Sequence, residues 1–226
     1  MTATALPTTP TDAPARSGPG LLLPALVTVV LFVAGVVVTA AFGDGLYSSP
    51  FATQPGDIAQ RYADHAGLIK AVGLLEFASA LALVVFTSAV WTRLRDAGPV
   101  ADVAAIGGVL AALFMALNAL VQWPLSYSSV SGTPAIRHAL ELLYFGLGGF
   151  AHVASLGLLV GGVSLAAMRQ LPRWFAIAGL VLATVSILST LTFVTEGAAV
   201  LLPLGRFITF VWLIVVSVLL GRRPAR

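Results

Sequence analysis

The sequence lacks cysteine, and only 9% of its 226 residues are charged. The absence of cysteine excludes disulfides, thiolate metal sites, iron–sulfur clusters, c-type haem attachment and cysteine nucleophiles. A soluble domain has nearer a quarter of its residues charged, so this chain has too few charges to cover a surface in water. We therefore expect a membrane protein rather than a soluble domain.

Several motifs that mark catalysis or binding are also missing. The chain has no P-loop, no HExxH, no GxSxG and no paired-aspartate phosphate motif. It has no basic surface with interleaved aromatic residues, and its last apolar segment has no lysine to form a Schiff base. No motif assigns a reaction, and we predict no cofactor, no metal site and no nucleic-acid partner.

What the chain has instead is apolar sequence, since 58% of its residues are hydrophobic. A transmembrane helix needs about 20 mostly apolar residues. Suitable segments lie at about 21–42, 67–92, 102–123, 135–168, 174–195 and 198–220. We therefore predict an all-α polytopic bundle of about six spans.

The segments outside the spans complete this prediction. We expect a transmembrane domain at 21–221, a disordered tail at 1–20 and a basic tail at 222–226. We expect loops at 43–66, with a short helix at about 57–65, and at 125–134. The first apolar segment exceeds the roughly 7–15 residues of a signal-peptide core. Because Val38-Thr39-Ala40 resembles a cleavage site, removal of this helix is an alternative that stays open.

The distribution of arginine gives the bundle an orientation. One side carries Arg16, Arg93, Arg95, Arg169, Arg173, Arg222, Arg223 and Arg226, whereas the other carries Arg61 and Arg137. The positive-inside rule then places both termini in the cytoplasm and the 43–66 loop outside. Because Lys70 is the only lysine, the composition suggests a high-GC bacterial gene. We expect a multi-pass protein of a bacterial plasma membrane.

Ionisable and amide side chains inside the predicted spans gather in the outer half of the membrane. They are Glu76, Asn118, Gln122, Glu141, Tyr144, His152 and Arg206. Glu141, Tyr144 and His152 share one face of the fourth helix, and Asn118 and Gln122 are one turn apart on the third. We predict an outward-facing polar pocket between the second, third, fourth and sixth helices. We expect Pro203 to bend the sixth helix beside Arg206.

This set of polar residues has a functional and a structural interpretation. A charge within hydrocarbon is costly, so an ionisable residue in a span suggests function. The structural alternative is an ion pair between Glu76 and Arg206 that fixes helix packing. The sequence favours neither. His152 on its own is more typical of a packed histidine than of a haem or metal ligand.

Two functions follow from the functional interpretation. The first is binding of a lipid, an isoprenoid-like molecule or another small amphiphile, or docking of a membrane protein partner. Arg206 would contact an anionic head group, and Asn118, Gln122 and Tyr144 would supply hydrogen bonds.

The second is an intramembrane enzyme of the cyclase, lyase or isomerase type that acts on a lipid-soluble substrate. Glu76 would be the general acid, with Glu141 or His152 as its catalytic partner. The inner half of the spans has only serine and threonine as polar residues, which argues against transport.

Three short segments carry a resemblance to a known group. They are Leu171-Pro172-Arg173-Trp174, Ala178-Gly179-Leu180 and the run from Leu201 to Phe207. Together they resemble a group of uncharacterised bacterial six-helix membrane proteins that share a domain of unknown function. The resemblance implies the fold and topology given above, and it implies no activity.

Overall fold

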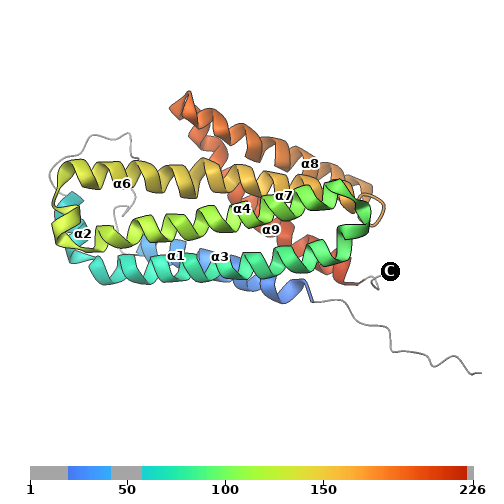
Figure 1. The fold of residues 1–226 in the computed structure, drawn as a ribbon, viewed down its shortest axis with the longest axis horizontal. Helices are drawn as coiled ribbons and strands as arrows, with labels where there is room; N and C mark the ends of the chain where they lie inside the picture. The colour runs from blue at the N-terminus through green and yellow to red at the C-terminus, as the bar shows by residue number, and fades with distance from the viewer. Residues whose placement is uncertain (1–19, 42–57, 223–226) are drawn as a thin grey trace, which may run out of the picture.

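The computed structural model describes residues 20–41 and 58–222, which form a bundle of helices (Figure 1). Within this described part, six helical segments are long and apolar enough to cross a membrane. They are Leu22–Ala41, Ala66–Ala97, Pro99–Ser126, Pro134–Ala166, Arg173–Phe193 and Glu196–Gly221. The predicted all-α polytopic bundle is therefore confirmed. The predicted tails at 1–19 and 223–226, and residues 42–57 of the longest predicted loop, lie outside the described residues.

Single long α-helices make up most of the spans. They are α1 (Leu22–Ala41), α3 (Ala66–Leu94), α4 (Pro99–Gln122) and α9 (Leu201–Gly221). The fourth span joins α6 (Pro134–Gly146) to α7 (His152–Ala166) through a π-helical turn, η3 (Leu147–Ala151). In the fifth, α8 (Arg173–Leu188) continues into the 3₁₀ turn η4 (Ser189–Phe193), and η5 (Glu196–Val200) then leads into α9. The connecting helices are α2 (Ile58–Asp64), η1 (Arg95–Ala97), η2 (Trp123–Ser126) and α5 (Ser128–Ser131).

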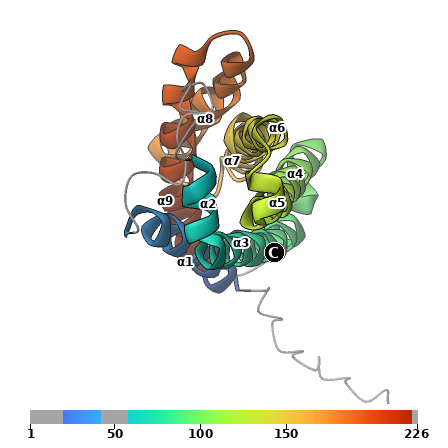
Figure 2. The ribbon, with the colours of Figure 1, turned by 90° about the vertical axis from the view of Figure 1, so that its left-hand side faces the viewer.

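The two ends of the bundle differ in charge. The arginine-rich end contains the turn from α3 to α4, the turn from α7 to α8 and the end of α9 (Figure 1). Its described arginines are Arg93, Arg95, Arg169, Arg173 and Arg222. The α2 end, which faces the viewer in Figure 2, contains α2, α5 and the start of α6. Which end faces the cytoplasm stays a prediction.

The half of the bundle nearer the arginine-rich end has an apolar core. There α4 packs between α3 and α7, while α1 packs on α3 and α9. A Cβ added to Gly162 would lie 2.7 Å from the backbone nitrogen of Ala104, so α4 and α7 cross in backbone contact. Small residues at a crossing of this kind are typical of membrane helices. The tight crossing fixes how α4 and α7 present their side chains toward the α2 end.

Large apolar side chains cover the outside of the bundle. Leu74 on α3, Ile106 on α4, Val181 on α8 and Val211 on α9 are each more than half exposed. Exposed apolar surface on this scale is a liability in water, whereas it is the ordinary outer face of a protein in lipid. The fold is therefore that of a multi-pass membrane protein.

Three expectations about the helices are wrong in detail. The segment at 125–134, expected to be a loop, contains the end of η2 and all of α5. The fourth helix, expected to run unbroken through 135–168, changes to a π-helical turn at Leu147–Ala151 and ends at Ala166. Pro203 is the third residue of α9 rather than an interior residue. In a first turn the backbone N–H has no partner within its own helix, so Pro203 removes no hydrogen bond of α9 and the reason for expecting a bend there is absent.

Candidate functional site

A cavity of about 510 Å³ opens among the helices in the half of the bundle nearer the α2 end. Its wall is built from α1, α3, α4, the α6–η3–α7 span and the η5–α9 span. Five of the seven predicted site residues line it: Glu76, Asn118, Tyr144, His152 and Arg206. The structure therefore brings together residues from four of the six spans, although their functional roles stay predictions.

Glu76 is held in the wall by two side chains. It projects from α3 and is buried. The amide Nδ2 of Asn118 on α4 donates a hydrogen bond to Glu76 Oε2 over 2.9 Å. The side chain of Tyr144 on α6 also hydrogen-bonds to Glu76. Two donors from two different helices thus fix the position of the carboxyl group.

Arg206 lies on α9 and faces an aromatic ring rather than a carboxylate. Its guanidinium carbon is 5.3 Å from the ring centroid of Phe32 on α1, within the range of a cation–π contact. In the described part of the chain no carboxylate oxygen lies within 4.0 Å of this guanidinium, and its Nε has no hydrogen-bond partner. The direct ion pair between Glu76 and Arg206 that the structural interpretation expected is therefore wrong. The two charges act on each other only at longer range.

His152 presents one nitrogen that already has a partner and one that has none. Its Nδ1 lies 2.8 Å from the backbone oxygen of Ala111 on α4. A carbonyl oxygen can only accept, so Nδ1 carries the hydrogen, and in a neutral ring Nε2 is then an acceptor. Among the described residues, Nε2 has no hydrogen-bond partner. No group of three or more His, Cys, Asp or Glu side chains suited to a metal occurs in the same residues.

The π-helical turn in the fourth span aligns two of these side chains. Tyr144 and His152 are eight residues apart, which on a regular α-helix would put them about 80° apart around the axis. A π turn takes up one extra residue. Around a single axis the angle between them would then fall to roughly 20°, as for residues seven apart, and the non-helical Gly149 (φ −79°, ψ −109°) adds a kink within the turn. Both side chains consequently reach the same cavity.

Glycine within this turn makes room for Asn118. A Cβ added to Gly148 would lie 2.5 Å from Asn118 Oδ1, closer than such atoms approach. The Asn118 amide can therefore lie directly over the backbone of η3 and reach across to Glu76. Other glycines of the fourth span serve helix packing instead, since a Cβ on Gly157 would lie 2.9 Å from the backbone oxygen of Ala183 on α8.

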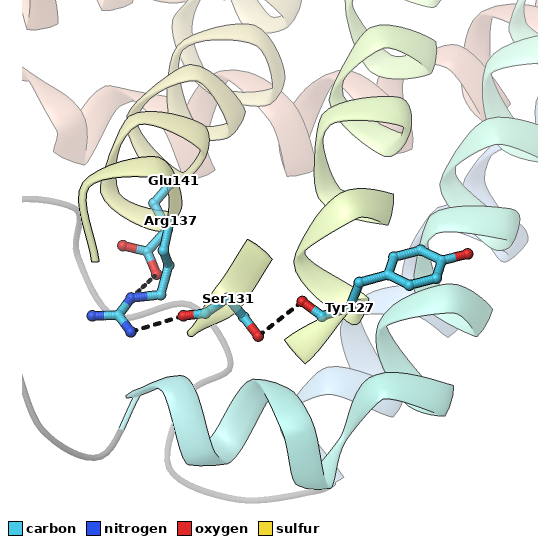
Figure 3. Close-up of polar contacts among 4 residues, drawn as sticks. All are labelled: Tyr127, Ser131, Arg137 and Glu141. Carbon is cyan, nitrogen blue, oxygen red and sulfur yellow. Dashed lines mark hydrogen bonds and ion pairs between the residues drawn. The ribbon is translucent and has the colours of Figure 1, made fainter. Parts of the chain in front are cut away.

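Glu141 does not line the cavity and belongs to a separate network at the α2 end (Figure 3). Its Oε1 lies 3.9 Å from the Nε of Arg137, one helical turn earlier on α6. The Nη1 of Arg137 donates to the backbone oxygen of Ser131 over 3.0 Å, and Ser131 Oγ donates to the oxygen of Tyr127. Glu141 is drawn into this network because Arg137 stands at the i−4 position on the same helix.

Gln122 is likewise absent from the cavity wall. It lies one turn beyond Asn118 toward the end of α4 and is buried. Its side-chain oxygen packs against α3, 3.4 Å from where a Cβ on Gly73 would stand. The structure therefore leaves Glu141 and Gln122 out of the cavity wall that the other five residues share, and their roles stay predictions.

The contribution of α1 to the cavity was missed by sequence reasoning. Phe32, Gly35 and Thr39, with Val36 and Ala40 beside them, line the wall, yet the predicted pocket did not include this helix. The helix is held in place by Ser79 Oγ on α3, which donates to the backbone oxygen of Thr28 over 2.7 Å. The structure buries five residues of this helix, which are Ala25, Thr28, Phe32, Gly35 and Thr39. Intervals that alternate between three and four mark one continuous packing face.

The fold and the cavity together define a class: a multi-pass α-helical membrane protein with a mostly apolar cavity between its spans, to which a few polar side chains contribute. Comparison of the chain with protein-family models, curated proteins and solved structures found no match. The resemblance to bacterial six-helix membrane proteins accordingly stays a prediction.

Proposed function

We propose that the protein binds a lipid-like amphiphile in this cavity, with the head group at Arg206. One observation carries the proposal. The Arg206 guanidinium lies in the cavity wall against the ring of Phe32, and every described carboxylate is more than 4.0 Å away from it. Burying a charge within a membrane span is costly unless a partner compensates it. An anionic group on a ligand would supply that partner, and arginine binds phosphate or carboxylate in a bidentate manner.

The remainder of the wall supports an apolar tail on the ligand. Met115, Phe145 and Leu202 line the cavity beside the polar residues. Val36 on α1 and Phe207 on α9 also line it, and both are more than a third exposed on the outside of the bundle. The cavity thus reaches the surface that would contact acyl chains. Sites of this kind, mostly apolar with a few polar groups, are typical of small-molecule binding.

Native mass spectrometry of the purified protein in mild detergent tests the proposal. We expect the wild-type protein to retain a small amphiphile and Arg206→Met to lose it. Arg95→Met is the matched control, because Arg95 is exposed at the arginine-rich end and should leave the ligand bound. A ligand-free wild-type mass, or a mass that shows only attached protein partners, would overturn lipid binding and favour a docking role for the bundle.

A second candidate is an intramembrane enzyme that acts on a lipid-soluble substrate. It is favoured by one observation: His152, whose buried Nε2 is an acceptor without a partner among the described residues, and Glu76 both belong to the cavity wall, so a base and an acid lie in the same site. If the protein is an enzyme, ligand that is extracted from it and then added back should be converted into a chemically different product. Glu76→Gln should stop this conversion without releasing the ligand, whereas a ligand that the wild type leaves unchanged rules out catalysis on it.

The location of the protein in the cell belongs to the same proposal. We infer a bacterial plasma membrane with both termini in the cytoplasm. The support is the contrast between the five described arginines at one end of the bundle and the α2 end, where the described arginines are Arg61 and Arg137. Basic residues are retained on the cytoplasmic side of membrane proteins.

A further inference from the structure

We propose that the head group this cavity recognises is a zwitterion of the phosphoethanolamine type, a phosphate joined to a primary ammonium. The inference rests on the proposed lipid binding and specifies its ligand. Among the described residues that line the cavity, Arg206 is the only arginine or lysine and Glu76 is the only acidic residue. A site with one charge of each sign complements a ligand with one charge of each sign.

Charge balance separates this ligand from a simple anion. A purely anionic head group would gain from Arg206 but would also be close to the Glu76 carboxylate. A zwitterion places its phosphate at Arg206 and its ammonium at Glu76, so it gains from both. Because Glu76 and Arg206 do not contact each other within 4.0 Å, a head group has to bridge two separate charges.

Hydrogen bonding then specifies the cation. The Glu76 carboxylate has about four acceptor positions, and its described hydrogen bonds come from Asn118 and Tyr144. A primary ammonium offers three N–H donors to these acceptors, whereas a quaternary ammonium such as choline offers none. The site should therefore distinguish the two by hydrogen bonding even though their charges are equal.

The apolar lining assigns the head group to a lipid rather than to a small solute in water. A soluble phosphoethanolamine could use the same charges but would leave Met115, Phe145 and Leu202 uncovered. A phospholipid would cover them with its glycerol and the first part of its acyl chains. These apolar side chains make contacts with a lipid that the solute cannot make, so the lipid should be retained more tightly than the solute.

The experiment is a competition among phospholipids with identical acyl chains. Delipidated full-length protein in mild detergent is offered phosphatidylethanolamine, its mono- and dimethylated forms, phosphatidylcholine and phosphatidylglycerol, and the bound species are counted by native mass spectrometry. We expect phosphatidylethanolamine to bind at least about tenfold more tightly than phosphatidylcholine or phosphatidylglycerol. Affinity should fall with each added methyl group.

A variant tests the role of Glu76 separately. Glu76→Gln should remove the preference for phosphatidylethanolamine over phosphatidylglycerol, and Glu196→Gln, which alters an exposed glutamate of η5, should preserve it. Gel filtration and thermal unfolding establish that each variant is folded. If Glu76→Gln does not fold, the methylation series on the wild type still decides the question.

Each result has a defined meaning. Equal binding of all five phospholipids would overturn the head-group inference while preserving lipid binding, and stronger binding of phosphatidylglycerol would do the same. A wild-type protein that binds none of them would overturn the proposed function itself. Binding of soluble phosphoethanolamine as tightly as of the phospholipid would overturn the lipid source, because the apolar lining would then contribute nothing.

Discussion

Gly148→Ala should disrupt the cavity wall, because the position of this glycine determines where Asn118 can lie. The added Cβ would stand 2.5 Å from Asn118 Oδ1 and 2.8 Å from its Nδ2. Ordinary contacts begin at about 3.4 Å, so the amide must retreat by roughly 1 Å. Its hydrogen bond to Glu76, now 2.9 Å long, would then exceed the range of a hydrogen bond.

The size of the effect follows from this lost bond. A hydrogen bond to a charged group contributes about 1.5–3 kcal/mol to stability. Replacing glycine by alanine within a helix stabilises the helix by up to about 1 kcal/mol, which offsets part of that loss. We expect a net loss of about 1–2 kcal/mol in the free energy of unfolding. For a chain of this size that lowers the Tm by roughly 2–8 °C. We also expect less lipid to be retained, since Glu76 loses one of its donors.

The assay is thermal unfolding in detergent combined with measurement of bound lipid. Gly35→Ala is the matched control: it makes the same change at another cavity-lining glycine, where the nearest neighbour of the new Cβ would be 3.7 Å away. A double-mutant cycle isolates the cause, because on an Asn118→Ala background the Gly148→Ala change meets no amide and should cost little. If Gly148→Ala were as stable as Gly35→Ala, or equally harmful without Asn118, the reasoning would be refuted.

Two further predictions concern topology and the network at the α2 end. Because the chain has no cysteine, a single introduced cysteine can report on which side of the membrane it lies. An impermeant maleimide applied to intact cells should label Ser129→Cys on α5, but it should label Asp96→Cys only after the cells are permeabilised. The reverse pattern would contradict a cytoplasmic arginine-rich end. Glu141→Gln should lower stability by no more than about 1 kcal/mol, given the long contact to Arg137. It should also leave lipid retention unchanged. A loss of lipid in this variant would indicate that Glu141 contributes to ligand binding after all.

The helical spans could be predicted from the sequence because each is a long apolar run with few charges. All six expected segments overlap the six spans of the structure. The short helix expected at about 57–65 corresponds to α2 (Ile58–Asp64). Length and hydropathy are local properties, and in a bilayer the backbone must satisfy its own hydrogen bonds, so a long apolar run has little alternative to a helix.

The cavity was harder to predict because its details depend on contacts between helices. Assuming a straight fourth helix placed Glu141 on the same face as His152, whereas the π-helical turn at Leu147–Ala151 changes the phase between them. The turn itself has only a weak signal, three glycines within four residues at 146, 148 and 149. The role of α1 was missed because a helix without ionisable residues gives no sign that it borders a polar site.

The separation of Glu76 from Arg206 supports the functional interpretation over the structural one. Two charges that serve only to fix helix packing gain most when they touch, because their attraction falls with distance while each still bears the cost of leaving water. Here Glu76 is held by Asn118 and Tyr144, and Arg206 is held against Phe32. Neighbouring side chains thus keep the two charges apart across a cavity instead of allowing them to meet. The attraction between Glu76 and Arg206 then acts only at longer range, and a ligand charge beside each of them would strengthen it, which supports the proposed binding over a role in packing alone.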